Sequence, residues 1–214
     1  MCFSVRIHSS IDDIINRFQV QFYGSLDSLI QGDLLAFTHP YLPVITKEKP
    51  NELLFFRWGL IPNWAKNEEI AKHTLNARWE TLSEKPAFKD YTQNRCLIIV
   101  NGFYEWKWLD PKGKRKEKYY LTLQENPSEP FAIGGIYNFW KNPKTNQLIP
   151  TFTLITQPAN KLMEEIHNSK KRMPLLLTKE TERDWLLGKI HEVPDVKLQA
   201  TKIQKSTSEN FQLL

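Results

Sequence analysis

The chain has 214 residues, of which 41% are hydrophobic and 12% are aromatic, so it can bury a core of its own, and a disordered or fibrous protein is excluded. Its 29 Lys and Arg residues against 24 Asp and Glu residues give a net charge of +5, which is compatible with an anionic partner without requiring one. No apolar run approaches the ~20 residues that cross a bilayer, and the start MCFSVRIHSS lacks the features of a secretory signal. Two cysteines, Cys2 and Cys96, are too few for a disulfide framework. We therefore expect a cytoplasmic protein with no membrane role.

The first half of the chain predicts short strands and two helix starts. Strands are predicted at 2–7, 34–37, 44–46 and 53–58, with prolines in the turns that separate them. Ser10 followed by Asp13 predicts a capped helix, because an apolar stripe follows at helical spacing. Asn67, followed by two glutamates, predicts a second helix start.

The second half predicts more strands and two further helices. Strands are predicted at 95–100, 103–108, 119–123, 131–137 and 152–156, and helices at 158–166 and 178–187. Asn101-Gly102 is a turn signal, the segment 110–113 (DPKG) predicts a hairpin, and Gly188 ends the last helix. Many strands with few helices predict an α+β fold. No repeat or linker divides the chain, so we expect one domain over 1–214, in which the polar tail from about residue 193 stays unassigned.

Cys2 is the most unusual residue for its chemistry. Removal of Met1 would leave an N-terminal cysteine, whose α-amine has an ordinary pKa of ~7.7–8.0 and whose thiol has one of ~8.5, so both nucleophiles are partly available near neutrality. The amine can form a Schiff base with an aldehyde, and the nearby thiol can then close a five-membered thiazolidine. An aldehyde is therefore the natural target. The alternative is that Cys2 is an incidental small residue at the start of a strand.

Six segments in a fixed order carry a resemblance to a known family. They are MC at 1–2, WGLIPNWA at 58–65, NARWET at 76–81, RCLI at 95–98, GFYEW at 102–106, and IH at 166–167 followed by RMP at 172–174. Together they resemble the SRAP family, the SOS-response-associated peptidase-like proteins that process abasic sites in DNA. The match spans residues 2–174, and its order makes it specific.

The resemblance implies a single α+β domain with a mainly antiparallel, barrel-like sheet centre, flanking short helices, and a positively charged groove for single-stranded DNA. It implies an abasic-site sensor of the DNA damage response, in which Cys2 captures the open-chain aldehyde as a thiazolidine crosslink, with no cofactor and no metal. By the same resemblance, Asn76 orients the amine and the sugar, Glu105 assists proton transfer, and His167 opens the sugar ring and helps to reverse the adduct. We expect a monomer that associates with the nucleoid during DNA damage.

Elementary chemistry agrees with these roles. Ring opening requires a proton donor that can be recovered, which suits His167, because the ordinary pKa of histidine lies near 6.5. Strand alternation points Glu105 away from Tyr104 and Trp106. The plainer alternatives are an outward-facing strand carboxylate for Glu105 and a histidine at a helix end for His167.

Several residues are expected at the DNA. The candidates are Arg78, Lys171 and Arg172 for phosphates, Trp58 and Trp64 for stacking, and Glu80 as an anchor for Arg78 or for the backbone. Aromatic clusters are more often core, and the lysines of the predicted hairpin at 107–118 are more often solvated, so the basic run 170–172 is the better phosphate candidate.

The chain departs from the family pattern at three places. Phe3 and Ser4 stand where the family start Met-Cys-Gly-Arg has glycine and arginine, and Arg6 is left as a possible substitute. The family's Ile-His-x-Arg-Met-Pro is lengthened to IHNSKKRMP, and its Asn-Val-Ala-Pro region has no clean counterpart at 38–45. These departures concern the grip on DNA more than the aminothiol reaction.

Two other functions stay open at this point. One is a peptidase that uses the N-terminal cysteine, on its own leader or more widely. An abasic-site lyase activity is not a separate alternative, because it would accompany the leading hypothesis. The other is a non-covalent single-stranded DNA-binding module in which Cys2 is inert. Neither a metal-ligand spacing among the cysteines and histidines nor a glycine-rich phosphate loop is present.

Overall fold

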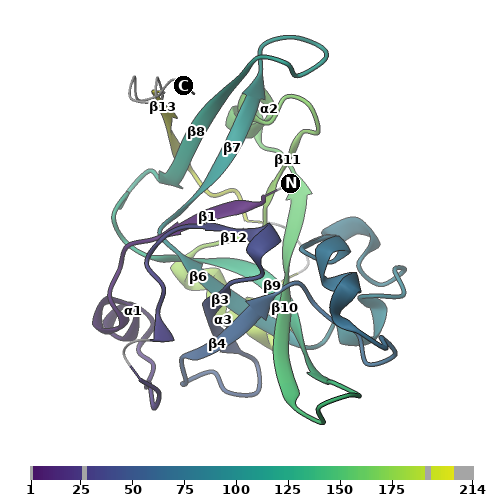
Figure 1. Ribbon diagram of the computed structural model, residues 1–214. Helices are drawn as coiled ribbons and strands as arrows, with labels where there is room; N and C mark the ends of the chain where they lie inside the picture. The colour runs from purple at the N-terminus through teal and green to yellow at the C-terminus, as the bar shows by residue number, and fades with distance from the viewer. Residues whose placement is uncertain (1, 26–27, 191–193, 205–214) are drawn as a thin grey trace, which may run out of the picture.

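The computed structural model describes residues 2–25, 28–190 and 194–204. Its upper part in Figure 1 is a five-stranded antiparallel sheet in the order β13-β8-β7-β1-β2. Its strands are β1 (Ser4–Ile7), β2 (Gly32–Leu35), β7 (Gly102–Trp108), β8 (Lys116–Leu123) and β13 (Leu198–Ile203). The chain start therefore lies in the middle of a sheet, flanked by β2 and β7.

A closed barrel of five strands forms the centre of the molecule. Its strands are β3 (Tyr41–Thr46), β4 (Leu54–Trp58), β6 (Arg95–Val100), β9 (Phe131–Lys141) and β10 (Leu148–Pro158). They pair in the order β10-β4-β3-β6-β9, and β9 pairs with β10 to close the ring. The β4–β10 pair is parallel and the other four are antiparallel, so the barrel is mixed. The expected α+β class with a barrel-like centre is confirmed.

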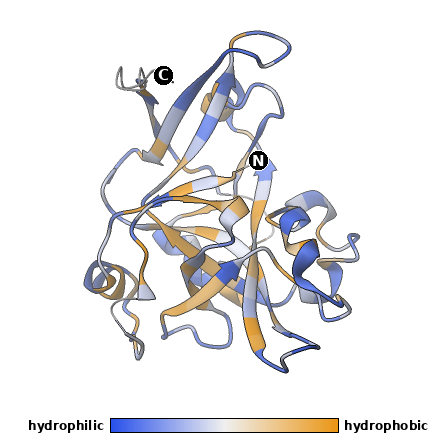
Figure 2. Cartoon of the chain, viewed as in Figure 1, coloured by the Kyte–Doolittle hydropathy of each residue, from blue (hydrophilic) through white to orange (hydrophobic). Residues whose placement is uncertain are grey.

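Short strands extend the barrel at the end nearest Cys2. β5 (Asn76–Arg78) runs parallel to β10 beyond the end of β4, and β11 (Arg172–Pro174) pairs with β10 beyond the end of β9. β12 (Leu176–Leu177) pairs with β9. Figure 2 shows hydrophobic residues concentrated on the barrel strands, whereas the far end of the β7–β8 hairpin is hydrophilic.

Asn101 connects the barrel to the upper sheet. The predicted turn at Asn101-Gly102 does not close a hairpin, because β6 belongs to the barrel and β7 to the upper sheet. The buried Asn101 side chain accepts hydrogen bonds from the backbone N–H groups of His8 (2.8 Å) and Ser9 (3.0 Å). Its Nδ2 donates to the Ser128 carbonyl over 3.0 Å. A side-chain amide thus fixes the crossover.

The helices begin near the predicted caps. α1 (Ile11–Phe18) begins after Ser10, which forms the expected capping box with Asp13. α3 (Lys179–Leu187) ends at Gly188, whose φ of 78° favours glycine. Asn67 caps a 3₁₀ helix, η3 (Glu68–His73), and α2 (Lys161–Ile166) is shorter than the predicted 158–166 because β10 runs to Pro158.

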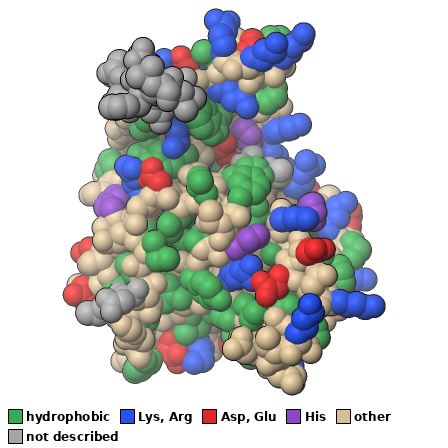
Figure 3. Space-filling model, in the orientation of Figure 1, with side chains coloured by type: hydrophobic (Ala, Val, Ile, Leu, Met, Phe, Trp, Pro, Cys, Tyr) green, Lys and Arg blue, Asp and Glu red, His purple; other side chains and the backbone are tan. Residues whose placement is uncertain are grey.

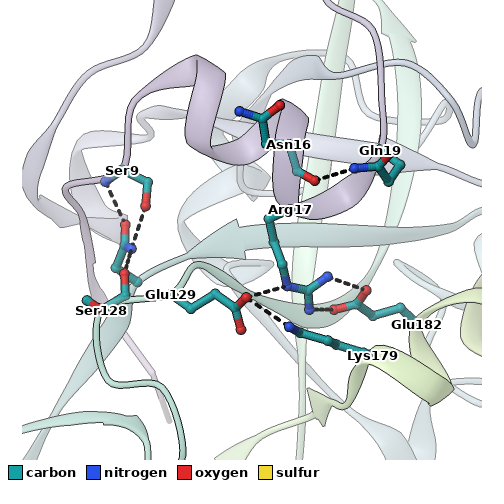
Figure 4. A network of polar contacts seen from close by, with 9 residues as sticks. Ser9, Asn16, Arg17, Gln19, Ser128, Glu129, Lys179 and Glu182 are labelled. Carbon is teal, nitrogen blue, oxygen red and sulfur yellow. Dashed lines mark hydrogen bonds and ion pairs between the residues drawn. The ribbon is translucent and has the colours of Figure 1, made fainter.

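A polar network joins α1 to α3. Arg17 donates two hydrogen bonds to Glu182, of 2.6 and 3.2 Å, and lies beside Glu129, which accepts a hydrogen bond from Lys179 over 2.8 Å (Figure 4). The guanidinium therefore fastens α1 to α3.

Four strands of the described residues were missed: the short strands β5, β11 and β12, and the longer β13. β13 lies in the tail that the sequence left unassigned from residue 193, and it pairs with β8 from Leu198 opposite Leu123 to Ile203 opposite Lys118. Leu198 is its one buried residue, so an edge strand of this composition gives almost no periodic signal. No helix within the described ranges is long and apolar enough to cross a bilayer.

Candidate functional site

Cys2 lies at the join between the barrel and the upper sheet. It lies two residues before β1, an interior strand of the upper sheet. Its side chain is fully buried, and its Sγ donates to the Ser4 carbonyl at 3.7 Å. Burial raises the pKa of the Cys2 thiol well above its ordinary value, and the negative charge of Glu105 raises it further. The thiol is therefore held protonated, within electrostatic reach of a carboxylate.

Asn76 holds the backbone of Cys2. Its Nδ2 donates a 2.8 Å hydrogen bond to the Cys2 carbonyl, and β5 is placed for this contact by its parallel register with β10. Ala77 faces the core, so strand alternation puts Asn76 and the exposed Arg78 on the opposite face. Oδ1 of Asn76 is buried and accepts no hydrogen bond within the described part of the chain. An acceptor is thus left available beside the start of the chain.

Glu105 and His167 lie close to each other, and Glu105 is near enough to Cys2 for its charge to act on the thiol. Glu105 comes from β7 and is almost fully buried, so the alternative of an outward-facing carboxylate is wrong. Burial raises the pKa of Glu105 to about 7. Its Oε2 lies 3.9 Å from Nε2 of His167. The carboxylate can therefore hold or release a proton at neutral pH.

The backbone carbonyl of Arg172, at the start of β11, sets the tautomer of His167. Nδ1 of His167 lies 2.7 Å from the Arg172 carbonyl, and because a carbonyl only accepts, Nδ1 carries the proton. Nε2 then faces Glu105 with its lone pair. Burial lowers the pKa of His167, so the ring is mainly neutral at pH 7.

Glu105 and His167 open onto a cavity of about 450 Å³. Its walls are formed by residues from β7, β8, the chain start and the loop after α2: Phe3, Glu105, Trp106, Trp108, Lys116, His167, Ser169 and Lys170. Phe3 stacks on the exposed ring of Phe37 with a centroid separation of 5.0 Å. The site therefore combines buried titratable groups with an aromatic and cationic entrance.

Arg172 does not have the expected role of a phosphate ligand. It is buried, and its guanidinium donates to both carboxylate oxygens of Glu80 and, over 2.7 Å, to the Thr156 carbonyl. The partner of Glu80 is Arg172 rather than the predicted Arg78, and the Arg172 hydrogen bonds hold the pKa of Glu80 below its ordinary value. The pair is a structural clamp between η4 (Trp79–Thr81) and β11.

The two tryptophans differ in their access to DNA. Trp58 is fully buried, its Nε1 donates to the Leu75 carbonyl at 2.8 Å, and its ring packs on Phe152, so the expectation that it stacks on a base is wrong. Trp64 is 56% exposed and stays a candidate for stacking. Arg78 and Lys171 are exposed and stay candidates for phosphate binding.

Arg6, the possible substitute for the arginine of the family start, is paired within the upper sheet. Its Nε donates to Asp33 over 2.6 Å, and its guanidinium lies over the rings of Tyr104 and Tyr120. Sequence reasoning also missed the entrance residues Phe3 and Trp108. Phe3 approaches Glu105 because β1 pairs with β7, whereas Trp108 lies three residues after Glu105 on the same strand. Within the described residues, no group of three or more His, Cys, Asp or Glu side chains is arranged to hold a metal ion.

Comparison with known proteins gives a consistent result. The family model described as SOS response associated peptidase (SRAP) matches residues 1–213. The abasic site processing protein YoqW of Bacillus subtilis (strain 168) is 41% identical over 187 residues, covering 87% of this chain and 80% of that protein. The abasic site processing protein HMCES of Gallus gallus is 30% identical over 146 residues, covering 58% of this chain and 42% of that protein.

Solved structures agree with the sequence match. A crystal structure of a protein from Bacteroides thetaiotaomicron has a TM-score of 0.84 and 32% identity, covering 95% of this chain and 92% of that one. One from Bordetella bronchiseptica has a TM-score of 0.76 at 20% identity and supports the fold alone. Because the family model covers nearly the whole sequence, this chain belongs to the SRAP family.

Proposed function

We propose that this protein is an abasic-site processing protein of the DNA damage response, which attaches covalently to single-stranded DNA through Cys2. The names of the relatives YoqW and HMCES support the abasic-site role. The observation that carries the covalent step is the convergence on Cys2 of Asn76, through its hydrogen bond to the Cys2 carbonyl, and of Glu105, through its charge.

The reaction requires a free α-amine on Cys2 and therefore the removal of Met1, which lies outside the described residues. The amine adds to the aldehyde carbon of the open-chain sugar, and both amine hydrogens leave with the aldehyde oxygen as water. The sulfur then adds to the same carbon, while the thiol hydrogen ends on the ring nitrogen. One thiazolidine and one water are formed, and no oxidant or reductant is needed.

The site chemistry supports an order for these steps. Because burial keeps the Cys2 thiol protonated, the amine is the first nucleophile and the thiol the second. Glu105, with a pKa of about 7, accepts the proton of the attacking amine. Nε2 of His167, which lies beside Glu105 and is unprotonated at rest, takes the proton of the anomeric hydroxyl group and passes it to the ring oxygen to open the ring, and the same group later helps to reverse the adduct.

The test uses single-stranded DNA that contains one abasic site. Wild-type protein should form a species that resists denaturation on a gel, and Cys2→Ala should form none. Cys96→Ala is the matched control, because Cys96 is a fully buried barrel residue, and this variant should crosslink like the wild type. Absence of the species from wild type, or its persistence in Cys2→Ala, would contradict the proposal.

Two further measurements separate the alternatives. Intact mass shows whether Met1 is absent, and a retained Met1 argues against both the crosslink and a peptidase that uses the N-terminal cysteine. Equal affinity for abasic and intact strands, with a steep dependence on salt and no crosslink, would favour a non-covalent single-stranded DNA-binding module.

A further inference from the structure

The loop that follows His167 is fastened to the free edge of β7. Oδ1 of Asn168 accepts a hydrogen bond from the Trp108 N–H over 3.0 Å, and its Nδ2 donates to the Trp108 carbonyl over 2.9 Å. Within the described strands, β1 pairs with β7 at Gly102 and Phe103, so the Trp108 end of that edge is open to this contact. The Asn168 side-chain amide therefore makes the two hydrogen bonds that a neighbouring strand would make, and it holds the loop against the sheet.

A tight turn fixes the other end of the same loop. The N–H groups of Lys170 and Lys171 donate to the His167 carbonyl over 3.3 and 2.8 Å, and Lys171 has a φ of 50°. With Asn168 fastened to β7 and the turn closed onto His167, Ser169 and Lys170 are held in position between them. These two residues form a wall of the cavity that contains Glu105 and His167.

Trp108 lies at the centre of the surface that the loop completes. It lines the 450 Å³ cavity and also a neighbouring hollow of about 460 Å³, and both share Ser169 and Lys170. Nζ of Lys116, on the adjacent strand β8, lies 5.1 Å from the centre of a Trp108 ring. An indole is therefore flanked by two lysines at the exit from the site.

The charge of this surface is positive. Lys116 and Lys170 face Glu105 and His167 across the cavity, and the neighbouring hollow adds Asp110. The Asp110 carboxylate already accepts backbone hydrogen bonds from residues 112, 114 and 115. Figure 3 shows further Lys and Arg side chains gathered over the end of the β7–β8 hairpin. The sequence treated the hairpin lysines and the run 170–172 as separate clusters, and the Asn168 contact joins them.

We propose that Trp108, Lys116 and Lys170 form a nucleotide subsite for the residue of single-stranded DNA next to the abasic site. The proposal rests on the proposed function, because a polymer whose abasic residue reaches Glu105 and His167 must place its neighbour in an adjoining hollow. The indole offers a stacking surface to a base of any sequence, and each lysine contacts one of the two phosphates that flank that nucleotide. The volume of the adjoining hollow, about 460 Å³, lies within the ~300–1,000 Å³ range of ligand pockets.

The test measures the affinity for a single-stranded oligonucleotide that carries a tetrahydrofuran, an abasic analogue without an aldehyde. We expect Lys116→Gln and Lys170→Gln each to raise Kd about fivefold, and the double variant to reduce the slope of log K against log salt by about 1.4, since one single-strand phosphate contact contributes about 0.7. Trp108→Ala should raise Kd about tenfold, and Trp108→Phe should restore much of the affinity, because a smaller aromatic ring still stacks.

Lys112→Gln is the matched control. Lys112 is an exposed lysine of the same hairpin that lines neither hollow, so its loss changes the net charge equally and should change Kd less than twofold. Thermal unfolding of each variant checks that the fold is retained.

The outcomes separate the two proposals. The subsite is overturned if the Lys116, Lys170 and Trp108 variants have the same Kd values and salt slopes as Lys112→Gln. The covalent function is unaffected by that result. Wild-type binding without a crosslink to natural abasic DNA overturns the covalent function, while the Kd values still decide the subsite. No binding of the tetrahydrofuran strand by the wild type overturns the subsite, and the crosslinking assay still decides the covalent function.

Discussion

Nδ2 of Asn76 lies 2.8 Å from the backbone carbonyl oxygen of Cys2, across 74 positions of sequence. This hydrogen bond joins the short strand β5 to the start of the chain, and it fixes the peptide group next to Cα of Cys2, the atom that carries the amine and the side chain with the thiol. The reacting amine and thiol are therefore oriented by the barrel rather than by their own strand alone.

Asn76→Ala should slow crosslinking about tenfold or more, because loss of this hydrogen bond frees the Cys2 peptide group and misplacement of a reacting group is costly. Single-turnover crosslinking at saturating abasic DNA measures the rate. The final yield should be unchanged, since the nucleophiles are intact. Asn126→Ala, at an exposed loop position, is the matched control, and an equal rate in both variants would contradict the role of Asn76.

Glu105 should make the protein less stable as the pH rises. Its pKa is about 7 in the folded state against an ordinary 4.5, so the folded state binds the extra proton and stability is lost as the pH rises from about 4.5 to 7. Glu105→Gln should remove this loss and raise the free energy of unfolding at pH 8 by up to about 3 kcal/mol relative to wild type, with little difference at pH 4.5. Urea denaturation at the two pH values measures it.

The same substitution should abolish rapid crosslinking, because glutamine cannot accept the proton of the amine. In the wild type, the crosslinking rate should rise through about pH 7 as Glu105 ionises. A Glu105→Gln variant that is no more stable at pH 8, or that crosslinks with the wild-type pH profile, would contradict the assignment of a buried base.

Substitutions of the neighbours Arg172 and Lys171 should have different effects, the first on stability and the second on DNA binding. Arg172→Lys should lower the free energy of unfolding by about 2 kcal/mol, because lysine cannot replace the paired hydrogen bonds to Glu80 and the bond to Thr156. Lys171→Gln should leave stability unchanged and weaken DNA binding with a smaller salt slope. Chemical denaturation and a salt titration of DNA affinity distinguish a structural arginine from a phosphate-binding lysine.

Asn168 should act on DNA through Lys170. Asn168→Ala removes both hydrogen bonds to Trp108 and frees the loop, so Lys170→Gln should then raise Kd by less than it does in the wild type. A double-mutant cycle of Kd for single-stranded DNA measures this coupling. Additive effects would show that the position of the loop does not depend on the Asn168 hydrogen bonds. The same cycle with Lys112→Gln in place of Lys170→Gln gives the uncoupled reference.

Local patterns predicted much of the secondary structure. Arg95–Val100 was predicted at its observed bounds, and the Ser10 and Asp13 capping box and the Gly188 helix end follow from interactions within a few residues. The closure of β9 on β10 and the crossover at Asn101 depend on pairing between distant segments, which no local pattern records. β13 was missed because an edge strand with one buried residue lacks a periodic signal.

The sequence by itself determined the chemistry that is available: an aminothiol after Met1, and the asparagine, glutamate and histidine in an order that resembles one family. Only the tertiary structure decided which side chains are buried, paired or open. Trp58 became core and Arg172 became a clamp for Glu80, because burial and ion pairing arise from contacts between remote segments. The same contacts shift the pKa of Glu105 to about 7, since removal of water from around a carboxylate disfavours its charged form.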